Sequence, residues 1–318
     1  MRNYIIRRGL LIIPTLFLVS LVVFFTIRAI PGKALDLMVM EHPTGTGGTI
    51  DVDALRTMLG LNDPPHVQYG KWMGGVLRGE FGKSLWSPRL LSEELALRLP
   101  VTFELGFLAF IIAQLIALPI GLFSAIRQDS VGDFFGRSFA IIALSVPGFW
   151  LGTMVMVFPS IWWGYSPPMK LIQFTQDPFA NLQQFLIPAT LMGLGMSGTT
   201  MRMLRTTMLE VLRQDYVRTA WAKGLRERIV VMRHGLRNAM IPVVTIIAGQ
   251  IPVMIGGAVI MEQIFNLPGM GRLFLDSINR RDYPFVSGIN VFLAAAGMII
   301  ILLTDLSYAY LDPRIRYK

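Results

Sequence analysis

The chain contains no cysteine and only three histidines among its 318 residues. Without cysteine it can form no disulfide framework, no thiolate metal site and no cysteine nucleophile, and its redox compartment cannot be inferred. His42, His66 and His234 lie far apart and lack the HExxH spacing of a zinc site. We therefore expect no metal in this chain and interpret each histidine as an ordinary polar residue.

Charge is also scarce, because only 15% of the residues are charged while 53% are hydrophobic and the mean hydropathy is +0.55. Such a composition is too apolar for an ordinary soluble domain and indicates an integral membrane protein. The net charge of +9 is not carried by a soluble domain and is not accompanied by an aromatic and basic nucleic-acid motif. We expect the lipid bilayer as a partner and no nucleic acid.

Six apolar runs are long enough to cross a bilayer once, at about 1.5 Å of helix per residue. They are Gly9 to Ile27, Leu105 to Ile126, Ser138 to Met169, Phe179 to Met201, Asn238 to Met261 and Tyr283 to Thr304. The first run is expected to be a retained helix, since Ala29-Ile30-Pro31 is a poor signal-peptide cleavage site. These runs predict an all-α membrane protein with six transmembrane helices and both termini on the same side.

The spans predict four regions of the chain. Residues 1–30 form a cytoplasmic N-terminus and the first transmembrane helix, and residues 31–100 form an extracytoplasmic loop region with short helices around 52–59 and 66–77. Residues 101–310 form the transmembrane core with a cytoplasmic loop at 202–237, and residues 311–318 form a cytoplasmic tail. Lysine and arginine concentrate in the termini and the 202–237 loop, which the positive-inside rule places in the cytoplasm of a cell membrane.

A basic segment from Glu210 to Pro242 separates two of the apolar runs. Leu209, Leu212, Tyr216 and Ala220 recur at helical spacing, which predicts one apolar stripe on a short helix. Gly224 is expected to end that helix in the left-handed conformation. A second helical piece follows, with Ile229, Val230 and Leu236 as its candidate contacts. From these residues alone, a loop held at the lipid headgroups by its positive charge is an equally good interpretation.

Two glycine motifs suggest nucleotide binding but lack its context. Gly82-Lys83-Ser84 resembles the end of a phosphate-binding loop, yet Leu77 stands where that motif requires glycine. The Gly193 to Gly198 segment fits G-x-G-x-x-G, but it lies within an apolar span with no strand before it, so close helix packing is the better explanation.

The basic segment resembles the EAA loop of ABC importer permeases, in the form typical of the dipeptide and oligopeptide (peptide, opine and nickel) branch. The matching residues run Arg218-Thr219-Ala220-Trp221-Ala222-Lys223-Gly224 and continue to Leu236 and Ile241-Pro242-Val243. Further stretches resemble the first of the two permease subunits of peptide-type importers. They are 4–10, 59–65, 79–84, 98–102, 265–272, 281–284 and 311–317.

The resemblance implies an ABC importer type I permease (MetI-like) fold and a complex with several partners. These are a second homologous permease subunit, two ABC ATPase subunits and an extracytoplasmic solute-binding protein. ATP and Mg would lie on the ATPase subunits, since this chain has no phosphate-binding loop and no ABC signature. The chain would thus be a transport subunit without an ATPase site of its own and not an enzyme, and it would hold no cofactor.

The resemblance also implies two sets of functional residues. The ATPase-coupling residues would be Arg218, Thr219, Ala220, Lys223, Gly224 and Leu236. The loop with Asn266, Pro268, Gly269 and Gly271 is a candidate outer gate or binding-protein contact, and a tight turn before the last span is an equally good interpretation.

The expected function is ATP-driven import of dipeptides or oligopeptides by alternating access. Nickel, glutathione or an opine could be moved by the same machinery. A secondary transporter or channel is the alternative from another class, but it would be expected to carry a charged residue deep within a span. Glu104 and Glu262 instead lie near span ends, and no cluster of residues supports a membrane enzyme.

Overall fold

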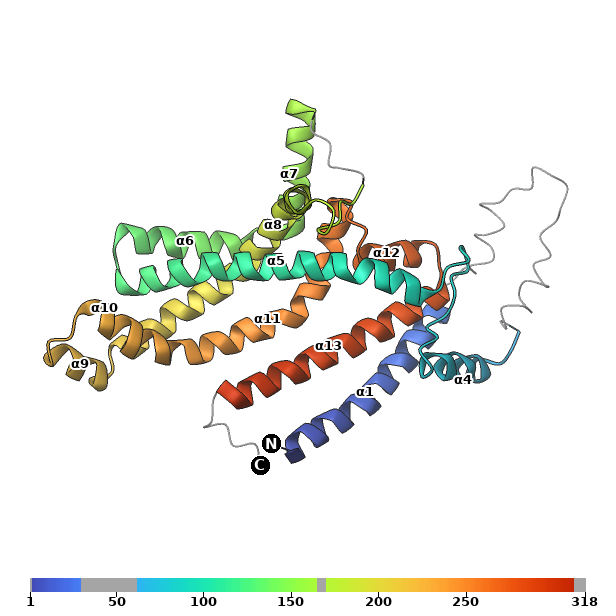
Figure 1. Cartoon of the computed structure of the whole chain (residues 1–318), viewed down its shortest axis with the longest axis horizontal. Coiled ribbons are helices and arrows are strands. Elements are labelled where there is room, and N and C mark those ends of the chain that lie inside the picture. The colour runs from blue at the N-terminus through green and yellow to red at the C-terminus, as the bar shows by residue number, and fades with distance from the viewer. Residues whose placement is uncertain (1, 30–61, 165–169, 312–318) are drawn as a thin grey trace. The chain divides into compact units, whose positions relative to one another are not determined.

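The computed structural model describes residues 2–29, 62–164 and 170–311 (Figure 1). These residues are helical apart from their connections and one isolated bridge between Lys83 and Leu90, which confirms the all-α expectation. The helices are α1 (Arg2–Ala29), α4 (Pro65–Val76), α5 (Leu91–Ile126), α6 (Val131–Ser145), α7 (Gly148–Trp163), α8 (Pro178–Leu212), α9 (Asp215–Ala222), α10 (Glu227–Ile229), the π-helix η1 (Val230–Leu236), α11 (Arg237–Ile264), α12 (Met270–Asn279) and α13 (Tyr283–Leu311).

Three of these helices are long and apolar enough to cross a membrane, through Gly9–Thr26 of α1, the length of α5 and Tyr283–Thr304 of α13. The paired helices α6 and α7 could form a fourth crossing within the described residues. Helices α8 and α11 contain the other two expected spans. The count of six therefore stays a prediction. The expected helix at 66–77 is confirmed as α4, whereas the one at 52–59 and the tail at 312–318 lie outside the described residues.

The apolar run from Ser138 to Met169, expected to cross the membrane once, is not one continuous helix in its described part, and its single crossing stays a prediction. Helix α6 already begins at Val131, and the chain bends by 89° between α6 and α7. Val146 adopts an extended conformation there, with φ −87° and ψ 121°. Proline disfavours the helical conformation of the residue before it, so Pro147 accounts for the break. The second helix ends at Gly164, whose φ of 64° is left-handed.

Contacts divide the chain into two units, the first formed by residues 1–100 and 272–302 and the second by 101–271 and 303–318. In the first unit, aromatic side chains join α1 to α4. The Phe24 ring lies 5.2 Å from that of Tyr69, whose hydroxyl is 2.8 Å from the hydroxyl of Ser20. Asp282 holds the 84–87 loop by accepting hydrogen bonds from the Ser84 hydroxyl and the Leu85 amide. Burial raises the pKa of Asp282.

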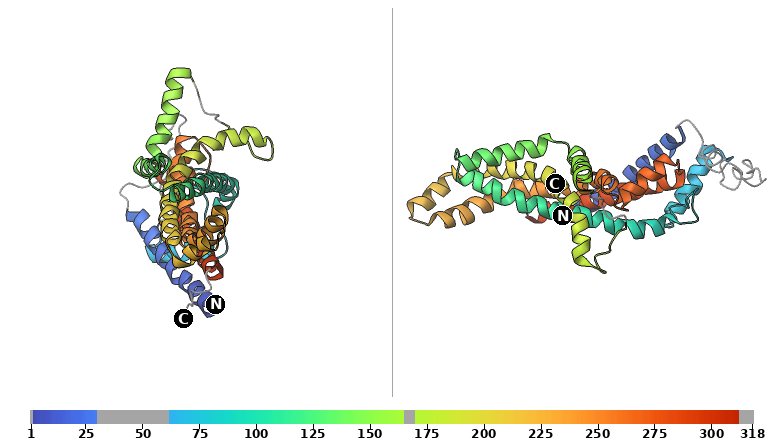
Figure 2. Two further views of the ribbon diagram at one scale, coloured as in Figure 1. Left: turned by 90° about the vertical axis from the view of Figure 1, so that its left-hand side faces the viewer. Right: turned by 90° about the horizontal axis from the view of Figure 1, so that it is seen from above.

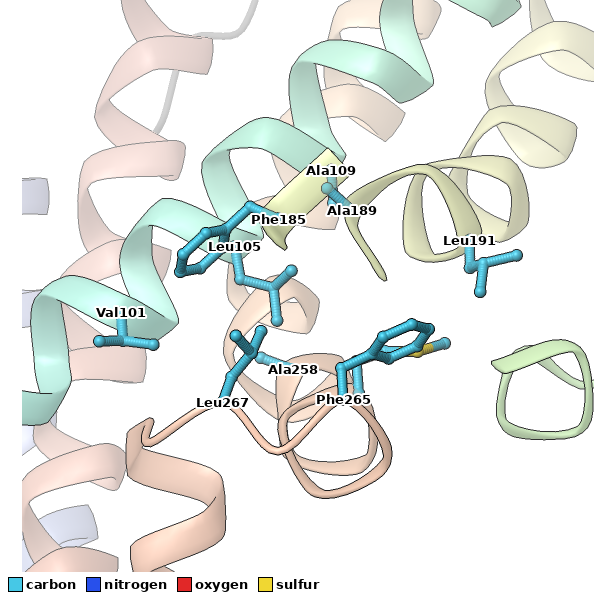
Figure 3. Packing of buried hydrophobic residues seen from close by; sticks show 10 residues of the cluster. Val101, Leu105, Ala109, Phe185, Ala189, Leu191, Ala258, Phe265 and Leu267 are labelled. Atoms are coloured by element: carbon cyan, nitrogen blue, oxygen red, sulfur yellow. The ribbon is translucent and has the colours of Figure 1, made fainter. Parts of the chain in front are cut away.

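The second unit is built on α5, α8 and α11. Phe185 and Ala189 of α8 pack beside Leu105 and Ala109 of α5, with Ala258 of α11 completing the contact (Figure 3). Glycines let α8 approach its neighbours closely. A Cβ on Gly193 would lie 2.8 Å from the Ala109 carbonyl oxygen, and one on Gly198 would lie 3.0 Å from that of Ala140. The 193–198 glycine motif therefore serves helix packing, as the sequence predicts.

Candidate functional site

The basic segment does not form a single helix. Helix α8 continues through the first part of the expected loop to Leu212, because Leu204, Met208 and Leu212 keep its apolar face against α5 and α11. The chain then turns through Arg213 and Gln214 and starts α9 at Asp215. The expected single stripe from Leu209 to Ala220 is therefore wrong, since its members lie on two helices separated by this turn.

A small apolar cluster, which we call the pivot, fixes α9 to the rest of the second unit. Its buried members are Val217, Ala220 and Val230, with partly buried Val211, Leu212 and Leu225 around them. Tyr216, expected in the stripe, instead has 43% of its surface exposed. Because Ala220 faces the pivot and is only 5% exposed, a larger residue there would crowd its own chain and not an outside partner.

The opposite side of α9 is polar and exposed. Arg218 has a side chain that is 73% exposed and lies 3.4 Å from the exposed carboxylate of Asp215. Thr219 and Lys223 are exposed as well, and the Thr219 hydroxyl donates to the Asp215 carbonyl at 2.9 Å. Trp221, which sequence reasoning did not select, is 46% exposed on the same short helix. Helix α9 and the Lys223 that follows it therefore expose two basic groups and an indole ring, while the other side of the helix packs into the pivot.

The segment after α9 returns through a π-helix that the sequence did not predict. Residues Val230 to Leu236 form η1, and Gly235 lets it approach α8, because a Cβ there would lie 3.2 Å from Leu212. The Tyr216 hydroxyl donates to the His234 carbonyl at 3.3 Å and accepts from the Asn238 amide at 2.9 Å. These bonds tie α9 to the return segment. Leu236 is half buried beside the core of α8 and α11, so it packs the return segment against these two helices.

Gly224 follows α9 with a φ of 73°, as the sequence predicts. Its amide donates to the Trp221 carbonyl at 2.9 Å, and nothing lies within 4 Å of a Cβ built on it. The glycine is thus required by backbone conformation and not by lack of space. We expect Gly224→Val to cost about 1–2 kcal/mol through left-handed strain, while Gly224→Asn costs less, because asparagine visits this conformation readily. Thermal unfolding of the two variants checks this, and equal losses would contradict it.

A buried ion pair joins α6 to α8, the helix that leads into α9. Asp133 of α6 has a fully buried side chain, and it accepts hydrogen bonds from Nε and Nη2 of Arg205 on α8, both at 2.8 Å. The Ser124 hydroxyl of α5 donates to the same carboxylate at 2.6 Å. The pair therefore joins α5, α6 and α8 at the end of the second unit where α9 and α10 lie (Figures 1 and 2). Nothing in the sequence pattern pointed to it.

The candidate outer loop is folded back on its own unit. The Thr102 hydroxyl donates to buried Glu262 at 2.5 Å and accepts from the Met270 amide at 2.8 Å. A Cβ on Gly269 would overlap the Glu262 carboxylate, and one on Gly271 would overlap Val259. Asn266 has a φ of 56°. Asn266, partly buried Pro268 and Gly269 thus lie in the tight turn between α11 and α12, and Gly271 lies in the first turn of α12. The gating role of these four residues stays a prediction.

The described residues contain no group of three or more histidine, aspartate or glutamate side chains that could hold a metal ion. The arrangement offers no set of groups for covalent or acid–base chemistry at α9 either. The site instead consists of a short helix with an exposed polar face, which is held in place by the apolar pivot and lies near a buried ion pair.

Comparison with known proteins supplies the wider context. Residues 117–317 match the family described as binding-protein-dependent transport system inner membrane component, and residues 1–106 match its N-terminal domain. The chain is 39% identical over 321 residues to the oligopeptide transport system permease protein AppB of Bacillus subtilis (strain 168), with both chains covered in full. It is 37% identical over 319 residues to the glutathione transport system permease protein GsiC of Salmonella typhimurium, again with full coverage.

Solved structures agree on the fold. A chain of the MetNI methionine ABC transporter aligns with a TM-score of 0.54 and 15% identity, covering 69% of this chain and 96% of that one. A chain of an amino acid ABC transporter aligns with a TM-score of 0.52 and 14% identity, covering 70% and 95%. The family and the apolar helices make the protein an integral protein of the cell membrane. The chain belongs to the family of binding-protein-dependent transport system inner membrane components.

Proposed function

We propose that this chain is the first of two permease subunits in an ATP-driven importer of dipeptides or oligopeptides. The observation that carries the proposal is that α9 has two different faces. Its basic face is exposed, while Val217 and Ala220 on the other face are buried in the pivot. A separate ATPase subunit docked on Arg218, Thr219 and Lys223 could move this helix without bending it. The pivot and the Asp133–Arg205 pair would then pass the motion to α5, α6, α8 and α11.

The solute is proposed from the relatives. One of the chains just described is named for oligopeptides and the other for glutathione, itself a tripeptide, and each matches this chain over its full length. A nickel or opine importer would use the same machinery and is the second candidate. In either case a second permease, two ATPase subunits and an extracytoplasmic binding protein complete the complex, with ATP and Mg bound on the ATPase subunits. Both termini and α9 would face the cytoplasm, following the positive charge.

Uptake by a reconstituted complex tests this function. The chain is purified with the proteins that co-elute with it and inserted into vesicles, and the uptake of labelled dipeptides, longer peptides, glutathione and Ni²⁺ is measured. We expect peptide uptake that requires both ATP on the α9 side and the binding protein on the other side. Peptide uptake without ATP or an ATPase partner would overturn the proposal in favour of a secondary transporter or channel. Uptake of Ni²⁺ alone would overturn the peptide assignment.

A further inference from the structure

A groove of about 180 Å³ lies between α5, α6 and α8, beside the Asp133–Arg205 pair. Its polar lining consists of Ser124, Arg137, Arg202, Arg205 and Thr206, and its apolar lining includes Ala140, Ile141 and Met201. Three arginines thus line one cavity whose lining surface is otherwise mostly apolar. The exposed side chains of Arg137 and Arg202 could therefore bind an anion from outside the chain.

The charge balance at this end of the helices is positive. Asp133 is the acidic group in contact with the groove arginines, and its two oxygens are already held by Arg205 at 2.8 Å. Arg137 lies 3.5 Å from that same shared carboxylate, and its side chain is 45% exposed. The guanidinium of Arg202 has no hydrogen bond or ion pair in the described part of the chain. With the neighbouring turn included, four arginines (127, 137, 202 and 205) stand against two aspartates (129 and 133) in the count of charges.

The surroundings of the groove are apolar. Ile141 on its wall is 62% exposed, and the adjoining outer face of α6 exposes Phe134, Phe135 and Ile142 by about as much. A free phosphate ion would use the arginines but none of this surface. A molecule with a phosphate head and hydrocarbon chains would use both, because guanidinium forks match phosphate oxygens and the exposed isoleucine and phenylalanine side chains of α6 would contact the chains. Basic pockets between transmembrane helices are known to bind anionic headgroups.

We propose that this groove binds the phosphate headgroup of an anionic phospholipid, held by Arg137 and Arg202 beside the fixed guanidinium of Arg205. Arg205 is already oriented by its bidentate bond to Asp133, so one donor of the site is in place before the lipid arrives. The acyl chains would lie along Ile141 and the exposed apolar face of α6 next to it. Because the site lies where α6 meets α8, a bound lipid would stabilise the contact between these helices, and α8 leads into α9.

Native mass spectrometry of the purified complex in detergent tests this assignment. Dioleoyl phosphatidylglycerol and dioleoyl phosphatidylcholine are titrated separately, with the chain as it is and with the double variant Arg137→Gln/Arg202→Gln. We expect phosphatidylglycerol to bind the parent more tightly than phosphatidylcholine. Each arginine removed should weaken its binding on the order of fivefold, as about 1 kcal/mol per basic residue implies. Arg228→Gln, which removes an exposed arginine of α10 outside the groove, should leave the affinity unchanged.

Three outcomes would overturn the proposal. One is equal affinity of the parent for the two lipids, and another is a double variant that binds phosphatidylglycerol as tightly as the Arg228→Gln control does. The third is displacement of the lipid by inorganic phosphate at an equal concentration, which would assign the site to a free ion. If the glutamine variant fails to fold, Arg137→Lys/Arg202→Lys keeps both charges and should retain the preference for phosphatidylglycerol, and loss of that preference would contradict the proposal.

Discussion

An Arg205→Gln variant is expected to lose about 3–5 kcal/mol of stability, because removing one partner leaves a buried charge without compensation. The Asp133 side chain is fully buried, and only 20% of the Arg205 side chain is exposed, so water cannot replace the guanidinium. The bidentate bond that joins α6 to α8 is lost at the same time. Thermal or denaturant unfolding of the purified chain in detergent measures the change.

Arg137→Gln is the matched control for that experiment. It removes a guanidinium that approaches the same carboxylate at only 3.5 Å and has a largely exposed side chain, so its cost should stay below about 1 kcal/mol. The double variant Asp133→Asn/Arg205→Gln should recover part of the loss, because no uncompensated charge remains buried. An Arg205→Gln variant as stable as Arg137→Gln would show that the ion pair does not hold the helices.

Composition and apolar runs were sufficient to predict the helical class and the placement of α1, α5 and α13. Local rules also predicted the left-handed Gly224 and the helix over α4, because glycine chemistry and helix starts depend on neighbouring residues alone. The break at Pro147 followed from an equally local rule, but the uniform hydropathy around it concealed the bend. The family resemblance, carried by ordered motifs along the whole chain, is confirmed by the family match.

Features that depend on distant residues could not be predicted. Asp133 and Arg205 are 72 positions apart, and no periodicity relates them. The apolar face of α9 was predicted only in part, because an eight-residue helix has few turns to define it. Ala220 is buried, as its place in the expected stripe implies, whereas Tyr216 is exposed and Val217 is the other buried residue of α9. Gly269 was selected as a gate residue, yet the overlap of a Cβ with Glu262 gives that glycine a packing reason as well.

The distinction between the buried and exposed faces of α9 leads to the prediction with the largest effect on activity. Arg218→Glu/Lys223→Glu should change the stability of the chain by no more than about 0.5 kcal/mol, because both side chains are exposed and away from the pivot. It should nevertheless abolish coupling. If an ATPase subunit docks here, two reversed charges place like against like, at a cost of several kcal/mol to the interface.

Four measurements on the same preparation separate docking from folding. Unfolding of the variant should match the parent, while co-purification of the ATPase subunits, solute-stimulated ATP hydrolysis and peptide uptake should each fall by at least about tenfold, as a loss above 1.4 kcal/mol requires. Arg127→Glu reverses an exposed charge in the α5–α6 turn, away from α9, and should leave all three activities unchanged. Full uptake by the α9 variant would show that the helix is not the docking element. An equal loss with Arg127→Glu would instead assign docking to the overall charge at the end of the second unit where α9 lies, since the packing of α9 through Val217 and Ala220 would then confer no specificity.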